Sequence, residues 1–439
     1  MAGLYLHIPF CQQACSYCDF YFSTRLQRVD DFVDAMELRI HQAGRSRWAS
    51  TKFKTLYFGG GTPSLLSLEH VERLLLAVDQ AFNTDFEEVT LELNPENSSK
   101  EYLEGLASLG ITRLSVGIQS LQPHILTFMH RAHDQEGALR CLEQLVASPF
   151  VRWSADLIIA NPGQSLDDVV ADVSLLAGFE PPHISAYVLM LEERTRLEKQ
   201  VALGRIQMPE GDIVADQMQA AQTSLKENGY TRYEVSSFAR VEASDTTELE
   251  TMKQPQNRAI HNSRYWDHQP YLGLGPSAHS LWWDGTVENA SATRWHEVKD
   301  LRQWMAVVHD NAAHPNVVHD NAAHHAECEK EFQQELELLD EVTLAEERIM
   351  MALRTSEGIS FQELADRYKV SFVEAHHQHI EQWIAHKWAV PGLVNHVKFT
   401  DTGLDRADAL LLDLLTIPLQ RNRLDVAETF PRESDKINA

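Results

Sequence analysis

Up to about residue 230, short apolar runs alternate with segments of helical periodicity, and this alternation constrains the fold more than any other feature. The strand-like runs are residues 3–8, 55–58, 89–93, 113–118, 154–160 and 183–191. Apolar residues at helical spacing follow Ser67 and Ser165, both suited to cap a helix. Six β/α units predict parallel strands with right-handed crossovers, and therefore an α/β barrel or partial barrel. Periodicity alone leaves open whether the barrel has six strands or eight.

A cysteine motif, C-x3-C-x2-C, follows the first of these runs and consists of Cys11, Cys15 and Cys18. Three thiolates on one loop can hold three irons of a cubane cluster, whereas an ordinary ferredoxin site supplies four cysteines per cluster. One alternative is a structural zinc site completed by His7, because structural zinc takes four ligands. A disulfide framework is disfavoured, because the chain has only five cysteines in 439 residues and disulfides suit small secreted domains.

Polar residues and glycines gather at the C-terminal ends of the strand-like runs, where β/α barrels place their active sites. Residues 59–61 are glycines and precede Thr62, while Glu92, Gln119 and Asp156 lie at the end of, or within, the next three runs. No Gly-Lys-Ser/Thr follows the glycines, so they do not form a phosphate-binding P-loop. They indicate either a tight turn or a backbone that approaches a ligand closely.

Charge and hydropathy exclude several classes of protein. The net charge of −26 argues against a general binder of nucleic acid or anionic membranes, because both need Lys and Arg. No stretch approaches the roughly 18 apolar residues of a membrane span, which leaves only peripheral membrane contact open. The first residues lack the basic and apolar regions of a signal peptide. We therefore predict a cytoplasmic protein.

Several strings of sequence resemble the radical S-adenosylmethionine (SAM) enzymes, and within them the HemN-like family of coproporphyrinogen III dehydrogenases. These strings are YLHIPFC (5–11), FGGGTPS (58–64), ELNP (92–95) and RLSVGIQS (113–120). Two more, HNSRYW (261–266) and YLGLGPSAHS (271–280), are similar to the heme chaperone branch, the HemW proteins. The resemblance covers roughly residues 1 to 410. It implies an open (β/α)6 TIM-like barrel, a [4Fe-4S] cluster on the three cysteines, and SAM at the iron that no cysteine holds.

The same resemblance implies a set of SAM contacts when the motifs are matched residue by residue. They are Tyr5, Tyr17, Gly60, Gly61, Thr62, Glu92, Gln119, Arg131 and Asp156. Arg131 would pair with the SAM carboxylate. The alternative interpretation is that Arg131 is an ordinary cation on the protein surface. The sequence departs from the family at Ala160-Asn161, close to Asp156, where Gly-Leu is usual.

The HNxxYW motif is implicated in heme binding in the chaperone branch. It makes His261 a candidate axial ligand, with Tyr265 and Trp266 beside it. The alternative is that these three side chains form an aromatic packing cluster. Two departures favour a chaperone over a dehydrogenase: Phe20 stands where the dehydrogenase has a further cysteine, and the longer N-terminal arm of the dehydrogenase is missing.

The motifs predict a protein that binds a [4Fe-4S] cluster, SAM and heme, and that delivers heme to a recipient hemoprotein. An electron donor is a second expected partner. The alternatives are an oxygen-independent coproporphyrinogen III dehydrogenase and a zinc-stabilised adaptor without redox chemistry. No nucleic-acid partner is expected.

Five segments are expected along the chain. They are the barrel (1–235), an extension with the HNxxYW motif (236–300), a His-rich linker (301–342), a HemN-type C-terminal domain (343–415) and a tail (416–439). The linker repeats VVHDNAAH at 307–314 and 317–324. His-rich tracts can bind metal, but a duplicated linker is the simpler interpretation. The C-terminal segment resembles a winged helix without a basic face, so an accessory role is expected.

Overall fold

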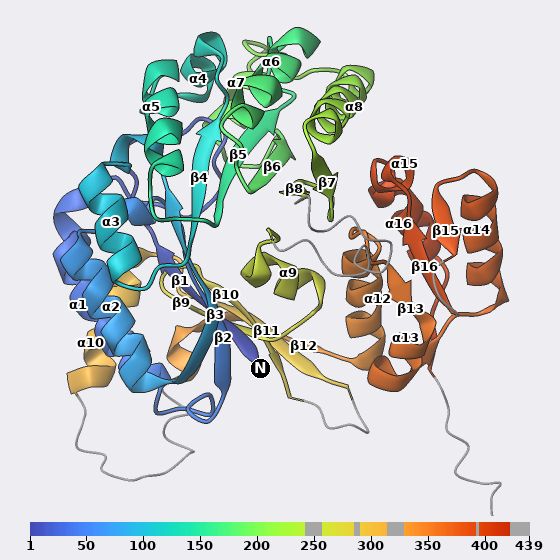
Figure 1. Cartoon of the computed structure of the whole chain (residues 1–439). Coiled ribbons are helices and arrows are strands. Elements are labelled where there is room, and N and C mark those ends of the chain that lie inside the picture. The colour runs from blue at the N-terminus through green and yellow to red at the C-terminus, as the bar shows by residue number, and fades with distance from the viewer. Residues whose placement is uncertain (242–256, 285–289, 314–328, 392–394, 422–439) are drawn as a thin grey trace, which may run out of the picture.

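The chain is built around one twelve-stranded sheet (Figure 1). The structure is a computed structural model that describes residues 1–241, 257–284, 290–313, 329–391 and 395–421. The strands lie in the order β12-β11-β10-β9-β1-β2-β3-β4-β5-β6-β8-β7. The six central strands are all parallel and follow the order of the chain. They are β1 (Ala2–Ile8), β2 (Lys52–Gly60), β3 (Asn83–Leu93), β4 (Arg113–Gln119), β5 (Trp153–Ile159) and β6 (His183–Val188).

The barrel is open, as the family resemblance implied. β1 pairs with β2 and β9, and β6 pairs with β5 and β8, so the first and last parallel strands do not meet. Each of the six predicted strand-like runs corresponds to one of these strands. The C-terminal ends of the parallel strands therefore share one edge, where a β/α fold places its chemistry.

Helices and short 3-10 turns connect the parallel strands, and in Figure 1 the helices α1 to α5 lie along one outer side of the sheet. They are η1 (Leu26–Arg28), α1 (Val29–Ala43), η2 (Pro63–Leu65), α2 (Leu68–Ala81), η3 (Pro95–Asn97), α3 (Lys100–Ser108), α4 (Pro123–Met129), α5 (Gln135–Val146) and α6 (Leu166–Ala177). Two further helices, α7 (Arg196–Ala202) and α8 (Gly211–Glu227), follow the last parallel strand. The predicted caps are present: the Ser67 hydroxyl accepts from the His70 N–H at 3.2 Å, and that of Ser165 from the Asp168 N–H at 3.1 Å. These bonds satisfy N–H groups that a helix start leaves without partners.

Six further strands extend the sheet at both ends, and most of them come from the segment that contains the HNxxYW motif. On the β6 side lie β8 (Ser237–Arg240) and β7 (Tyr230–Arg232), both antiparallel to their neighbours. On the β1 side, β9 (Tyr271–Leu274) pairs in parallel with β1, and β10 (His279–Trp283), β11 (Ala292–Glu297) and β12 (Gln333–Leu339) follow antiparallel. The HNxxYW motif itself forms α9 (Ile260–Trp266).

Part of the expected linker has regular structure, because residues 301–313 form α10 (Leu301–Ala313) and β12 is an edge strand of the sheet. Most of the His-rich repeat, residues 314–328, lies outside the described residues, as does the tail from residue 422. The proposed division into five segments stays a prediction.

The C-terminal elements form a small domain around a three-stranded antiparallel sheet, β13-β16-β15. They are α12 (Glu341–Ala352), β13 (Ile359–Ser360), α13 (Phe361–Tyr368), β14 (Val370–Ser371), α14 (Glu374–Ala385), β15 (Ala389–Pro391), β16 (His396–Phe399), α15 (Asp401–Leu404), α16 (Ala407–Leu415) and β17 (Gln420–Arg421). The helices α13 and α14 precede the hairpin that β15 and β16 form. The domain's apolar core is continuous with Leu281, Ala292 and Leu339 of the large sheet, so the two parts pack together. Within the described ranges, no helix is long and apolar enough to cross a membrane.

A buried cluster of charges ties α1 to the extension. The guanidinium of Arg39 donates to Glu297 at 2.8 Å and to both carboxylate oxygens of Glu329 at 2.8 and 2.7 Å. Glu297 also accepts from the Gly275 N–H at 2.8 Å and from the indole of Trp304 at 2.6 Å. Every oxygen that the cluster removes from water therefore has a donor, which a buried ion pair requires.

Candidate cofactor site

The three cysteines of the motif lie on the loop after β1, free and half-buried. Within the described part of the chain, no three His, Cys, Asp or Glu side chains are placed to share one metal ion. A structural zinc gathers its ligands around a single ion, whereas a cubane takes each thiolate on a different iron. His7 is also engaged, because its Nε2 lies 2.9 Å from the Tyr21 carbonyl oxygen and its Nδ1 3.2 Å from the Tyr5 hydroxyl. Both ring nitrogens of His7 are therefore occupied, which argues against His7 as the fourth ligand of the zinc alternative.

The environment of these thiols controls their charge. Burial raises the pKa of Cys11 to about 11 and that of Cys18 to about 12. Both are therefore protonated at neutral pH in the metal-free protein, and binding a metal displaces the protons. Two donors face the sulfurs: the Thr62 hydroxyl lies 3.7 Å from Cys11 Sγ, and an Arg131 Nη lies 3.5 Å from Cys15 Sγ. Such donors favour a thiolate over a thiol.

The glycine run at the end of β2 packs directly against the cysteine loop. Gly60 has φ +114°, a conformation that favours glycine, and a Cβ there would lie 2.5 Å from the His7 ring. A Cβ on Gly61 would lie 2.6 Å from the Phe10 carbonyl oxygen. The close approach that these glycines permit is thus to β1 and the loop that follows it, and it sets Thr62 beside the first cysteine.

The carboxyl group of Glu92, at the end of β3, is held by two donors. It accepts from the Tyr57 hydroxyl at 2.9 Å and from the Gly60 N–H at 3.0 Å. Tyr5 stacks on Tyr57 with 6.0 Å between ring centroids. Burial raises the pKa of Glu92 from its usual 4.5 to about 7, because desolvation outweighs these two hydrogen bonds.

We expect the raised pKa of Glu92 to appear in the pH dependence of stability. Between about pH 4.5 and pH 7 the unfolded chain ionises Glu92 while the folded protein keeps it protonated. Stability should therefore fall as the pH rises through this window, and the loss attributable to Glu92 should be complete above it. The shift from 4.5 to about 7 corresponds to roughly 3 kcal/mol. Glu92→Gln should remove this loss, which urea unfolding of both proteins at pH 4.5 and pH 7.5 measures; an unchanged pH dependence would contradict it.

Three of the predicted SAM contacts carry buried polar atoms without a hydrogen-bond partner among the described residues: Oε1 of Gln119, Nε of Arg131 and Oδ1 of Asp156. The other oxygen of Asp156 accepts from the Ser115 hydroxyl at 3.0 Å. Gln119 has φ +66°, which is uncommon for a residue other than glycine and often marks a functional site. Unsatisfied buried polar groups are costly, so these atoms fit a site built for a polar ligand.

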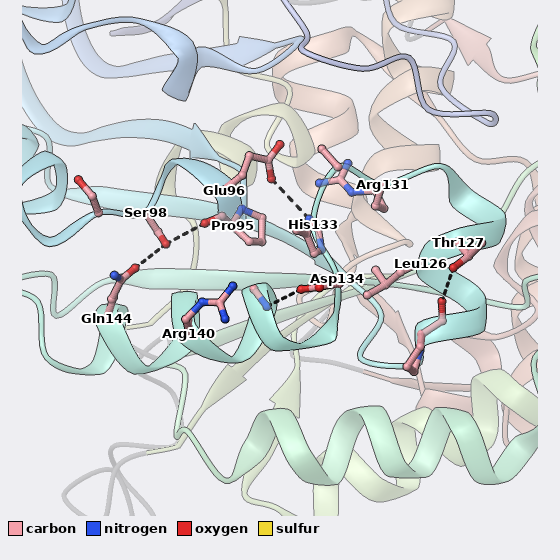
Figure 2. A pocket seen from close by; sticks show the side chains of 14 residues that line it. Pro95, Glu96, Ser98, Leu126, Thr127, Arg131, His133, Asp134, Arg140 and Gln144 are labelled. Carbon is pink, nitrogen blue, oxygen red and sulfur yellow. Dashed lines mark hydrogen bonds and ion pairs between the residues drawn. The ribbon is translucent and has the colours of Figure 1, made fainter.

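Arg131 lies on the connection between α4 and α5 (Figure 2). Its guanidinium donates to Asn94 Oδ1 at 2.8 Å and to the Gly117 carbonyl at 3.0 Å, in addition to its contact with Cys15. The same connection lines a pocket of about 690 Å³. Arg131 is thus held between the ends of β3 and β4 and the cysteine loop, an arrangement unlike that of a free surface cation.

The remaining predicted SAM contacts lie around the same edge of the sheet. Tyr5 lies on β1, and Tyr17 lies on the cysteine loop, packed on an apolar cluster that includes Met129 of α4. The structure therefore gathers the predicted set from the first five strands and the loops that follow them. It also adds Asn94, which donates to the Thr62 hydroxyl at 3.2 Å and accepts from Arg131.

A cavity of about 1180 Å³ opens beside this edge. Tyr5, Tyr57 and Glu92 line it from the barrel strands, and Tyr271 and His279 line it from β9 and β10. Its other aromatic lining residues are Phe20, Tyr21, Phe22, Tyr187, Tyr265 and Trp266. Sequence reasoning did not identify His279 as a functional residue, although it lies within the string YLGLGPSAHS that carries part of the resemblance.

Comparisons with known proteins agree with the motifs. The family model of the radical SAM superfamily matches residues 5–176, and that of the HemN C-terminal domain matches residues 339–389. The heme chaperone HemW of Lactococcus lactis is 28% identical over 384 residues, which are 87% of this chain and 89% of that protein. The heme chaperone HemW of Mycobacterium tuberculosis is 34% identical over 302 residues, 68% of this chain and 72% of that protein.

The chain belongs to the HemW family of radical SAM proteins. A solved structure, coproporphyrinogen III oxidase (HemN) from Escherichia coli, has a TM-score of 0.72 at 18% identity and covers 94% of this chain and 89% of its own. That similarity confirms the HemN-like fold. Because a chaperone and an oxidase share this fold, the fold alone does not decide between the two activities.

In the HNxxYW motif of this chain, the ring of His261 contacts other side chains of the protein through both of its nitrogens. The ring of His261 is 1% exposed. Its Nδ1 lies 2.8 Å from the Thr55 hydroxyl and its Nε2 lies 2.8 Å from the Tyr265 hydroxyl. Burial lowers the pKa of His261 to about 3, so the ring is neutral. These contacts correspond to the alternative of an aromatic packing cluster, and the role of His261 as a heme ligand stays a prediction.

Proposed function

We propose that this protein is a cytoplasmic heme chaperone that carries a [4Fe-4S] cluster and SAM and passes heme to recipient hemoproteins. The observation that carries the proposal is the cavity of about 1180 Å³ with its aromatic lining. A porphyrin is a large flat apolar ring, and stacking on aromatic side chains is how such a ring is held. The volume is at or above the roughly 300–1,000 Å³ usual for small-molecule pockets. The names of the HemW relatives support the same function.

In this proposal Cys11, Cys15 and Cys18 hold the cluster. Together with SAM, the bound cluster supplies one-electron chemistry. Arg131 balances the negative charge of the cysteine loop and meets the SAM carboxylate. The unpartnered atoms of Gln119 and Asp156 take up further polar groups of SAM, and Glu92 accepts from its ribose.

Arg131→Ala should weaken SAM binding without removing iron, because it deletes a charged partner of the ligand and no iron ligand. A hydrogen bond to a charged group is worth roughly 1.5–3 kcal/mol, so the loss should be about 10- to 100-fold. Calorimetry on anaerobically reconstituted protein measures it. Arg140→Ala is the matched control, because Arg140 lines the same pocket but pairs with Glu136 on the exposed face of α5. Equal SAM affinity in the two variants would remove Arg131 from the site.

Two assays on the same reconstituted protein test the function. Ferric heme is titrated and then offered to an apo-globin, and coproporphyrinogen III is supplied with SAM and a reductant in parallel. The proposal expects saturable heme binding, transfer to the globin and no decarboxylated porphyrin. Decarboxylation without heme binding would instead support the dehydrogenase alternative. Phe20, 64% exposed at the position of the dehydrogenase's additional cysteine, leads us to expect the first outcome.

A further inference from the structure

Three imidazoles line the large cavity, those of His7, His261 and His279. Iron ligation needs a ring nitrogen with a free lone pair. His7 and His261 each have both ring nitrogens in hydrogen-bonding contact with neighbouring oxygens. Ligation by either ring would break a hydrogen bond in the protein and leave its partner to find another.

His279 differs from the other two imidazoles. Its side chain is exposed, and in the part of the chain that the structure describes no hydrogen bond or ion pair reaches its ring. Its ring contact is with His296, at 5.2 Å between centroids and an interplanar angle of 52°. Partial desolvation of the ring by the surrounding protein, together with the neighbouring His296, lowers the pKa of His279, and the neutral ring is the form that ligates.

The backbone around His279 fixes where the ring lies. His279 and Leu281 both line the cavity, as expected of alternate residues on one face of β10. The turn before the strand contains Gly275 and Ser277 at positive φ, +112° and +67°. The Gly275 N–H is bound by the buried carboxylate of Glu297, so the turn is anchored to the Arg39 cluster. A ligand on an anchored strand end can be positioned more accurately than one on a free loop.

We propose that His279 is the axial heme ligand in this cavity and that His261 supports the wall behind it. This inference rests on the proposed heme-binding function. Tyr271 and Leu281, on the same wall as His279, offer apolar surface to the porphyrin. Lys299 lines the same cavity with its side chain 53% exposed, and its positive charge suits a heme propionate.

Ferric heme titration of the full-length reconstituted protein tests the assignment, with the Soret band and the low-spin imidazole spectrum as readouts. His279→Ala should lose the imidazole spectrum and bind heme more than about 10-fold less tightly. Removing a residue that merely hydrogen-bonds to a metal ligand already weakens metal binding by about 10-fold or more, and His279 would be the ligand itself. His279→Gly should regain the spectrum when free imidazole is added. Iron and sulfide content should be unchanged in both variants, which shows that the barrel remains folded.

His261→Gln is the matched control, because an amide can still bond the two hydroxyls but has no imidazole. It should keep the imidazole spectrum. The inference is overturned if His261→Gln loses that spectrum while His279→Ala keeps it. It is equally overturned if both variants keep it and only deletion of residues 307–325 removes it. A wild-type protein that binds no heme would refute the proposed function itself, a result distinct from a misassigned ligand.

Discussion

Replacing Cys11, Cys15 or Cys18 by alanine, one at a time, should abolish the brown iron–sulfur chromophore and bring iron and acid-labile sulfide close to zero. The expected effect is all-or-none, because the three thiolates would share one cluster and the motif has no spare cysteine. Two of the three thiols are held protonated by burial in the metal-free protein. Their ionisation must then be driven by the metal, so an incomplete ligand set lacks the free energy to do it. Iron, sulfide and absorption measurements on anaerobically reconstituted protein check this.

Cys141→Ala is the matched control, since Cys141 is a fully buried core side chain of α5. Cys328→Ala is a second control, at a position outside the described residues. Both variants should retain the full chromophore. Equal loss of iron in these variants and in the three motif variants would mean that the cluster ligands are misassigned. Stoichiometric zinc without acid-labile sulfide in the unsubstituted protein would instead support the zinc-stabilised adaptor.

The six parallel strands could be predicted because each is a short, nearly continuous apolar run, as buried parallel strands are. The start of β3 could not. The run 89–93 was expected, but the strand begins at Asn83. Residues 83–87 are polar except for Phe86 and alternate between exposed and half-buried positions, and this stretch pairs with β2 before the pairing with β4 begins at Thr90. Apolar periodicity reveals only strands that are buried. This part of β3 is little buried, so its sequence carries no such pattern.

The extension shows a second limit of sequence reasoning. Local periodicity predicts that a strand forms and leaves its partner undetermined. β9 pairs in parallel with β1 across about 270 residues, with Gly3 opposite Tyr271 and Leu6 opposite Leu274. This pairing brings the strings YLHIPFC and YLGLGPSAHS side by side and forms the second wall of the cavity. The motifs were recognisable separately, but their shared cavity required the fold.

The candidate site was predictable to a different degree for each residue. The SAM set is implied by the family resemblance, and the structure brings its members together around the C-terminal ends of the parallel strands, where a β/α fold places its chemistry. Their role in binding SAM stays a prediction. For His261 the sequence offered an imidazole with Tyr265 one helical turn away. It could not reveal that Thr55 of β2 would occupy the other ring nitrogen. That contact depends on how α9 packs on the sheet.

Arg39→Met should destabilise the protein by about 3–5 kcal/mol, the range found when one partner of a buried ion pair is removed. The substitution keeps the length and apolar surface of the side chain but leaves Glu297 and Glu329 without their cation. Their side chains are only 0% and 9% exposed. Burial already raises the pKa of Glu297, with Arg39 opposing that shift, so the variant should lose more stability as the pH rises through the range where the carboxyls ionise.

Arg73→Met is the matched control for this prediction. Arg73 also pairs with two carboxylates, Asp34 and Glu37, but on the outer surface between α1 and α2, with side chains 27–62% exposed. Exposed pairs are worth about 0–1 kcal/mol, so Arg73→Met should lower the free energy of unfolding only slightly. Urea unfolding of both variants measures this, and Arg39→Met should show the much larger loss. Equal losses would show that burial does not set the strength of the Arg39 cluster. Adding Glu297→Gln and Glu329→Gln to Arg39→Met should recover much of the loss, because no buried charge then remains. The Gly275 N–H would still find an amide acceptor at position 297, so the turn that positions His279 should survive in the triple variant.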